Sequence, residues 1–150
     1  MHLKITSIDN IIFDWEVENV NIPTEDWYIW IFPNHMPITS VVKAWLVKIL
    51  PVEKKESMLE KWSFVFDDDK LAISVGKGLL FSDWNEIVMT VSSASSLSEN
   101  TEEELSKMKE QLQKDIQQLK EKGGSIEDIE KSLMEYEKIS ADIKLKKISG

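Results

Sequence analysis

Residues 25–39 read Glu-Asp-Trp-Tyr-Ile-Trp-Ile-Phe-Pro-Asn-His-Met-Pro-Ile-Thr. Pro33 and Pro37 flank the tripeptide 34–36. Each proline fixes φ and lacks a backbone donor, so the tripeptide is expected to form a rigid, non-helical corner. The aromatic and β-branched residues of 28–32 and 38–42 favour extended structure on both sides. The stretch therefore predicts two strands joined at a proline-bounded corner.

Composition limits the classes of protein to which the chain can belong. With 150 residues and 42% hydrophobic residues, it can bury a core in one or two small domains. A net charge of −9 repels phosphate backbones, so we expect no nucleic-acid partner. The chain has no cysteine, and all 18 basic residues are lysines. No apolar run approaches a membrane span and no signal-peptide pattern is present, so we expect no direct membrane insertion.

Residues 1–92 have the pattern of an all-β domain. Short apolar runs separated by polar turns indicate a sandwich or barrel rather than βαβ units. Along 11–22, Val17, Val20 and Ile22 are the expected inward residues. Asp67, Asp68 and Asp69 predict a charged hairpin loop, with a metal site as the weaker interpretation. The expected strands are 3–7, 11–22, 28–32, 38–42, 46–50, 58–59, 64–66, 71–75, 79–81 and 87–91.

Residues 93–100 are rich in serine and predict a linker, and 101–150 predict an antiparallel two-helix hairpin. Thr101 can cap the first helix, with Glu104 completing a capping box, and Ser125 can cap the second after Gly123-Gly124. Two narrow apolar stripes recur at helical spacing: Leu105, Met108, Leu112, Ile116 and Leu119 in the first helix; Ile126, Ile129, Leu133, Tyr136 and Ile143 in the second. The predicted class is α+β, with a flattened antiparallel β-sandwich followed by this hairpin.

The two stripes leave the resting state of the hairpin open. The helices can bury their stripes against each other, or in a second state pack them against a partner protein. Two packings of one narrow apolar stripe can differ little in energy. The simpler interpretation is a hairpin that only rests on the β domain.

Catalytic patterns are not evident in the sequence. The chain has two histidines, the terminal His2 and His35, and no cysteine. His35 therefore has no second histidine or cysteine with which to form a catalytic or metal-binding group. Residues 75–78 contain two glycines and a lysine but do not form a phosphate-loop motif. They lack the further glycine, the Ser or Thr after the lysine, and the helix that follows such a loop. We therefore expect no enzyme, no metal site and no bound cofactor, and we interpret His35 as a structural hydrogen-bonding residue.

The proline-bounded corner resembles the signature of the epsilon subunit of F-type ATP synthases. Glu25, Pro33, His35, Pro37 and Thr39 carry the likeness, and two glycines of the family pattern fall on tryptophans. The β half, the serine-rich linker and the helical hairpin follow in the order and at the lengths of that family. The resemblance therefore covers essentially the whole chain, although the helices match by pattern only.

The resemblance implies a non-catalytic central-stalk (rotor) subunit of a proton-transporting ATP synthase, peripheral on the cytoplasmic face of the bacterial cell membrane. The implied partners are the gamma subunit and the polar loops of the c-ring, which Glu25, Asp26 and Tyr28 would face. The hairpin would be able to extend along gamma and inhibit ATP hydrolysis. Lys144, Lys146 and Lys147 would then meet acidic loops of a catalytic head subunit. Some members bind ATP through an arginine-containing motif, and a chain without arginine is not expected to do so.

Six tryptophans lie in the β half, which has only Gly76 and Gly78 in its first hundred residues, where average usage gives about seven glycines. Four of these tryptophans occupy family glycine positions, and Trp84 stands where a hairpin turn favours glycine. Some bacterial lineages read the UGA codon as glycine. We therefore hypothesise that all six are glycines in the living protein, and expect turn strain at φ > 0 in the tryptophan form. The six are Trp15, Trp27, Trp30, Trp45, Trp62 and Trp84.

Two other interpretations of the tryptophans remain open, namely deliberate engineering and a real aromatic surface. The second corresponds to a different function: a β-sandwich and coiled-coil adaptor that binds an unrelated partner through an aromatic patch, since tryptophan often anchors interfaces.

Overall fold

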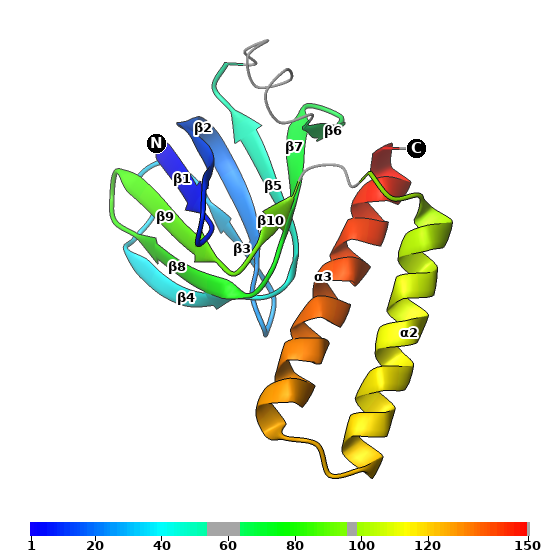
Figure 1. Ribbon diagram of the computed structural model, residues 1–150. Helices are drawn as coiled ribbons and strands as arrows, with labels where there is room; N and C mark the ends of the chain where they lie inside the picture. The colour runs from blue at the N-terminus through cyan, green and yellow to red at the C-terminus, as the bar shows by residue number, and fades with distance from the viewer. Residues whose placement is uncertain (54–63, 96–98, 150) are drawn as a thin grey trace.

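The structure is a computed structural model that describes residues 1–53, 64–95 and 99–149. It contains a β-sandwich and, beside it, a hairpin of two helices (Figure 1). The strands are β1 (His2–Thr6), β2 (Ile11–Pro23), β3 (Tyr28–Ile31), β4 (Ile38–Val42), β5 (Trp45–Pro51), β6 (Val65–Asp67), β7 (Lys70–Val75), β8 (Gly78–Ser82), β9 (Glu86–Val91) and β10 (Ala94–Ser95). The strand expected at 58–59 lies outside the described residues.

The strands form one continuous sheet folded into two layers, in the order β10-β7-β5-β2-β1-β9-β8-β4. β3 adds to β2, and β6 adds to β7. All pairs are antiparallel except β1 with β9. The long strand β2 joins the layers because its first part pairs with β1 and its second part with β5 and β3. The predicted β-sandwich is therefore confirmed.

The sandwich core lies between the two layers and is built from apolar side chains. Val17, Val20 and Ile22 point inward, as expected, and each is at most 1% exposed. Phe13 is fully buried, with its ring centroid 4.9 Å from that of Trp15 and 6.3 Å from that of Phe64. All nineteen buried members of this cluster lie between residues 3 and 91, so the sandwich buries its core without help from the helices.

Turn geometry confirms one expectation and overturns another. Asp68 has φ 58° in the tight turn between β6 and β7, which confirms the charged hairpin loop. Asn34 has φ 65° at the proline-bounded corner. Among the described residues, no other non-glycine residue has positive φ. The strain expected at tryptophan is therefore absent at the five described ones, because their backbones stay in regions that any L-residue adopts.

The helices are α2 (Glu102–Glu121) and α3 (Ile126–Ser149). Thr101 Oγ1 accepts a hydrogen bond from the Glu104 amide at 3.2 Å, and Ser125 Oγ accepts one from the Asp128 amide at 3.2 Å. Gly123, at φ 68°, reverses the chain after the first helix. Both predicted caps and the glycine stop are therefore found. Within the expected linker, Ala94–Ser95 forms a short strand against β7.

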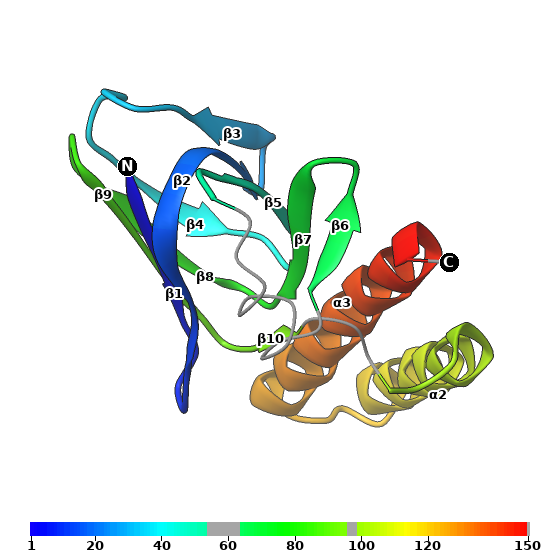
Figure 2. The ribbon, with the colours of Figure 1, turned by 90° about the horizontal axis from the view of Figure 1, so that it is seen from above.

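The helix α3 lies between the sandwich and α2 (Figures 1 and 2). Ala141 and Leu145, at 0% and 1% exposure, pack against β5, β6 and β7. Neither residue belongs to the predicted second stripe, whose first member, Ile126, is 75% exposed. The prediction missed this face because α3 has two packed sides. Ala141, Leu145 and Ile148 recur at steps of four and three, a signal that was present in the sequence.

Candidate partner-binding surfaces

An exposed acidic loop joins β2 to β3. Thr24 closes the loop by donating from its amide to the carbonyl oxygen of Trp27 at 2.7 Å. Glu25, Asp26 and Tyr28 are all exposed. Glu25 lies 3.5 Å from the ammonium of Lys77, but both side chains are half-exposed, so the pair adds little stability. The structure therefore brings the three predicted loop residues together and leaves them accessible.

The proline-bounded corner runs from the end of β3 to the start of β4. The amide of His35 donates to the carbonyl oxygen of Phe32 at 3.1 Å, which closes a turn around Pro33 and Asn34. The Nδ1 atom of His35 lies 2.7 Å from the carbonyl oxygen of Met36. Pro37 then leads into β4, where Thr39 pairs with Phe81. These local bonds place His35 within the turn itself.

A second surface, which we call the open face, lies on the outer side of β4 and β8. It consists of Val41, Leu79 and Phe81, which are 39%, 61% and 56% exposed. Val41 pairs directly with Leu79, so the two side chains share one side of the sheet, and Phe81 follows Leu79 on that side. No motif in the sequence marks these three residues. Alternation along β8, with Leu80 and Ser82 buried, was the available signal.

The open face and the acidic loop are neighbours. Thr24 forms a bridge with Val42, the last residue of β4, and Glu25 meets Lys77, which precedes β8. The opposite outer surface of the sandwich, on β5, β6 and β7, is covered by α3. The sandwich therefore has one outer surface occupied by its own hairpin and another that no described part of the chain covers.

The three lysines near the end of α3 do not form one surface in this state. Lys144 lies near Asp67 and helps to lower the pKa of that carboxyl, although the main cause is the hydrogen bond from Lys48 at 2.9 Å. Lys147 faces the other way, 3.8 Å from Glu102 on α2. Lys146, between them, is half-buried. The docked hairpin therefore directs these cations toward different parts of the chain.

The described tryptophans are all at least partly exposed. Trp27, Trp84 and Trp30 are 77%, 55% and 43% exposed, and Trp30 stacks on Phe32 at 6.3 Å. Trp45 is half-buried, and Trp15 packs on the edge of the core. Trp62 lies outside the described residues. Tryptophan is usually among the more buried residues, so a well-packed core beside a set of exposed indoles is unusual.

A cluster at the start of the sandwich makes a pH-dependent contribution to stability. The Asp14 carboxylate, aided by that of Glu16, accepts a hydrogen bond from the His2 ring and so raises the pKa of His2 above 6.5. The stabilisation is complete below the unfolded pKa and is lost as pH rises through the higher folded pKa. We therefore expect the melting temperature of the wild type, relative to that of His2→Gln, to fall as the pH rises above about 6.5 and passes through the higher folded pKa. Equal pH profiles for the two proteins would contradict this expectation.

Comparison with known proteins finds a matching family and a relative along most of the chain. Residues 1–75, half of the chain, match the family model described as ATP synthase, Delta/Epsilon chain, beta-sandwich domain. The chain is 26% identical over 140 residues to the ATP synthase epsilon chain of a Nitratiruptor species, covering 93% of this chain and 97% of that one.

Two solved structures share the fold. A chain in the mitochondrial ATP synthase of Euglena gracilis, solved as OSCP/F1/c-ring, aligns with a TM-score of 0.65 at 15% identity, over 93% of this chain and 76% of that chain. A chain in the central stalk/c-ring of the Tetrahymena thermophila mitochondrial ATP synthase aligns with a TM-score of 0.50 at 11% identity, over 70% of this chain and 69% of that chain.

The match over the β-sandwich defines the class of protein to which this architecture belongs. The chain belongs to the delta/epsilon family of ATP synthase chains, in which it is an epsilon subunit, a non-catalytic subunit of that complex. Neither described helix is long and apolar enough to cross a membrane.

The glycine hypothesis gives a direct prediction. Trp27, Trp30 and Trp84 are exposed, so glycine at these three positions opens no cavity between the sheets, whereas Trp15 and Trp45 pack on the edges of apolar clusters. We expect the intact mass of the native chain, purified with its ATP synthase from the host, to match glycine at all six positions. A mass that matches six tryptophans would refute the hypothesis and strengthen the aromatic-surface interpretation.

Proposed function

We propose that this epsilon chain works in the rotor of a proton-transporting ATP synthase and links the gamma subunit to the c-ring. The observation that carries the proposal is the open face beside the acidic loop. The open face supplies apolar area for a protein partner, and the neighbouring loop supplies charge. In this proposal the open face binds gamma, and Glu25, Asp26 and Tyr28 face the c-ring loops.

The assignment of surfaces follows from their chemistry. Apolar strand faces of this kind mark interfaces when several exposed side chains adjoin. Leu79 and Phe81 can fill the buried centre of a contact with gamma, whereas exposed carboxylates at a rim mainly steer association and set register. The complex, and therefore this chain, would lie at the cytoplasmic face of the bacterial cell membrane through those partners. His35 and its prolines would hold the corner at the start of β4 rigid.

The hairpin completes the proposal as an inhibitory element. In the docked state Lys144 lies near Asp67 and Lys147 near Glu102 within the chain. After undocking, Lys144, Lys146 and Lys147 would be available for acidic loops of a catalytic head subunit. Inhibition of ATP hydrolysis would then require the extended hairpin and would be absent from the docked one.

Binding to recombinant gamma tests the open face. We expect Phe81→Glu to weaken binding more than tenfold, because burying an unpaired carboxylate in an apolar contact costs several kcal/mol. Ile126→Glu is the matched control, since Ile126 is 75% exposed at the far end of α3. Titration calorimetry measures both affinities, and circular dichroism checks folding. Equal, wild-type affinity in both variants would refute the assignment.

A second candidate function is the adaptor with an aromatic patch. Trp27, Tyr28, Trp30 and Phe32 are all exposed along and beside β3, and the Lys70 ammonium lies 4.4 Å from the Trp30 ring centroid. If these indoles are present in the native chain, they form a binding strip distinct from the open face. Failure to bind gamma, together with binding to another protein that is lost in Trp27→Ala, would favour this function.

A further inference from the structure

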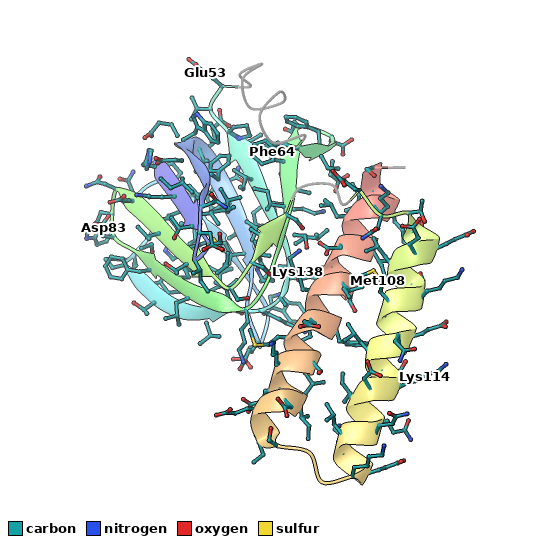
Figure 3. All side chains as sticks on the ribbon, in the orientation of Figure 1. Glu53, Phe64, Asp83, Met108, Lys114 and Lys138 are labelled. Carbon is teal, nitrogen blue, oxygen red and sulfur yellow. The ribbon has the colours of Figure 1, made fainter. Side chains whose placement is uncertain are left out.

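Three polar side chains meet where the hairpin touches the sandwich. Lys138 Nζ donates to Ser95 Oγ at 2.7 Å and to Asp142 Oδ1 at 2.7 Å. Ser95 Oγ in turn donates to Asp142 Oδ1 at 2.9 Å. Lys138, labelled in Figure 3, and Asp142 come from α3, one turn apart, whereas Ser95 comes from β10 of the sandwich. We call these three residues the latch triad.

The triad is shielded from water. The side chains of Lys138 and Asp142 are each 14% exposed, far less than those of the other ion pairs between side chains described for this chain. A shielded ion pair needs further hydrogen bonds to offset its lost hydration. Ser95 supplies two, one to each charge. Lys138 and Asp142 belong to the same helix, so the contact between them survives undocking. Ser95 is therefore the member of the triad that connects α3 to the sandwich.

The rest of the docking contact is mainly apolar. It joins Leu46, Val65 and Ala72 of the sandwich to Ala141 and Leu145 of α3. Apolar packing of this kind has little directional preference, because the hydrophobic effect scales with area. The hydrogen bond that Ser95 accepts from Lys138 and the one that it donates to Asp142, by contrast, require one position of α3 along β10. The triad therefore specifies where α3 docks as well as how firmly.

We propose that Ser95, Lys138 and Asp142 form a latch that holds the hairpin on the sandwich. The latch sets the fraction of chains whose hairpin is free to extend. This inference rests on the proposed inhibitory function only for its consequence in the enzyme. The docking equilibrium itself is a property of the isolated chain.

Docking can be measured on the full-length chain alone. The chain has no cysteine, so Glu18→Cys and Lys114→Cys, both exposed, accept spin labels at defined places on the sandwich and α2. We expect Ser95→Ala to raise the ratio of undocked to docked chains by about tenfold or more, because it removes both charge-assisted bonds. Ser132→Ala, a serine on α3 beside α2, is the matched control and should leave the distance distribution unchanged.

A double variant separates the latch from general damage to the helix. Lys138→Met leaves Asp142 shielded and without its cation and should undock the hairpin. Lys138→Met with Asp142→Leu removes both charges and should recover much of the docking, since apolar replacement of a buried pair is often tolerated. Docking unchanged in Ser95→Ala would overturn the latch, whatever the ATPase assay gives. Loss of docking with unchanged ATP hydrolysis would support the latch and refute the inhibitory function.

Discussion

Ending the chain after Ser98 is expected to preserve gamma binding and to raise ATP hydrolysis by the reconstituted complex several-fold. The truncated chain keeps all nineteen buried members of the sandwich core and the whole open face. It loses the element that would extend toward the catalytic head. Without the hairpin, the extended inhibitory state cannot be populated at all, so inhibition of ATP hydrolysis should disappear rather than weaken.

Hydrolysis rates of complexes with full-length and truncated chains provide the measurement. Loss of the hairpin uncovers Leu46, Val65 and Ala72, so calorimetric melting of the truncated chain must first establish that it folds. Gamma affinity serves as the control, because the missing helices cover a different outer surface from the open face. Equal hydrolysis rates at equal occupancy would refute the inhibitory proposal while leaving the rotor proposal intact.

Replacing Phe13 by alanine is expected to lower the free energy of unfolding by about 3–5 kcal/mol. The ring is fully buried between the sheets and contacts Trp15 and Phe64 edge-on or tilted. A domain of this size has a total stability of only about 5–15 kcal/mol, so the loss is a large fraction. Urea denaturation followed by far-UV circular dichroism measures the change.

Phe81→Ala is the matched control for that experiment. Its ring is 56% exposed on the open face, so its truncation should cost less than about 1 kcal/mol. Similar losses in the two variants would mean that the open face is buried in the isolated chain, which would contradict both the position of the core and the availability of that surface for gamma.

Local sequence patterns predicted the elements and their ends well. The proline-bounded corner, the charged turn at Asp68, both helix caps and the reversal at Gly123 depend on backbone chemistry within a few residues. The inward set on β2 followed from alternation. The expected strain at tryptophan failed because turn position alone does not require positive φ. At Trp84, for example, the turn is held by the Asp83 carboxylate, which accepts from two following amides at 2.8 Å.

Local sequence patterns did not predict which distant strands pair with each other. Alternation marks which side chains of β8 point outward, but the open face exists only because β8 pairs with β4, about forty residues earlier in the chain. The latch triad joins Ser95 to residues 43 and 47 positions away. The second packed side of α3 was also missed, because the pattern at Ala141 and Leu145 lies beside the predicted stripe and only the tertiary structure shows that both sides are packed.

By itself, the sequence determined the two-part architecture, the element boundaries at caps and turns, and the family, because these depend on residue type and short spacing. The tertiary structure alone decided which surface is left open and which is covered, which lysines are engaged, and what holds the hairpin in place. Those properties depend on the register of distant strands and on the choice of one helix face over another. Each is settled by the burial of apolar area across the whole chain rather than by any local segment.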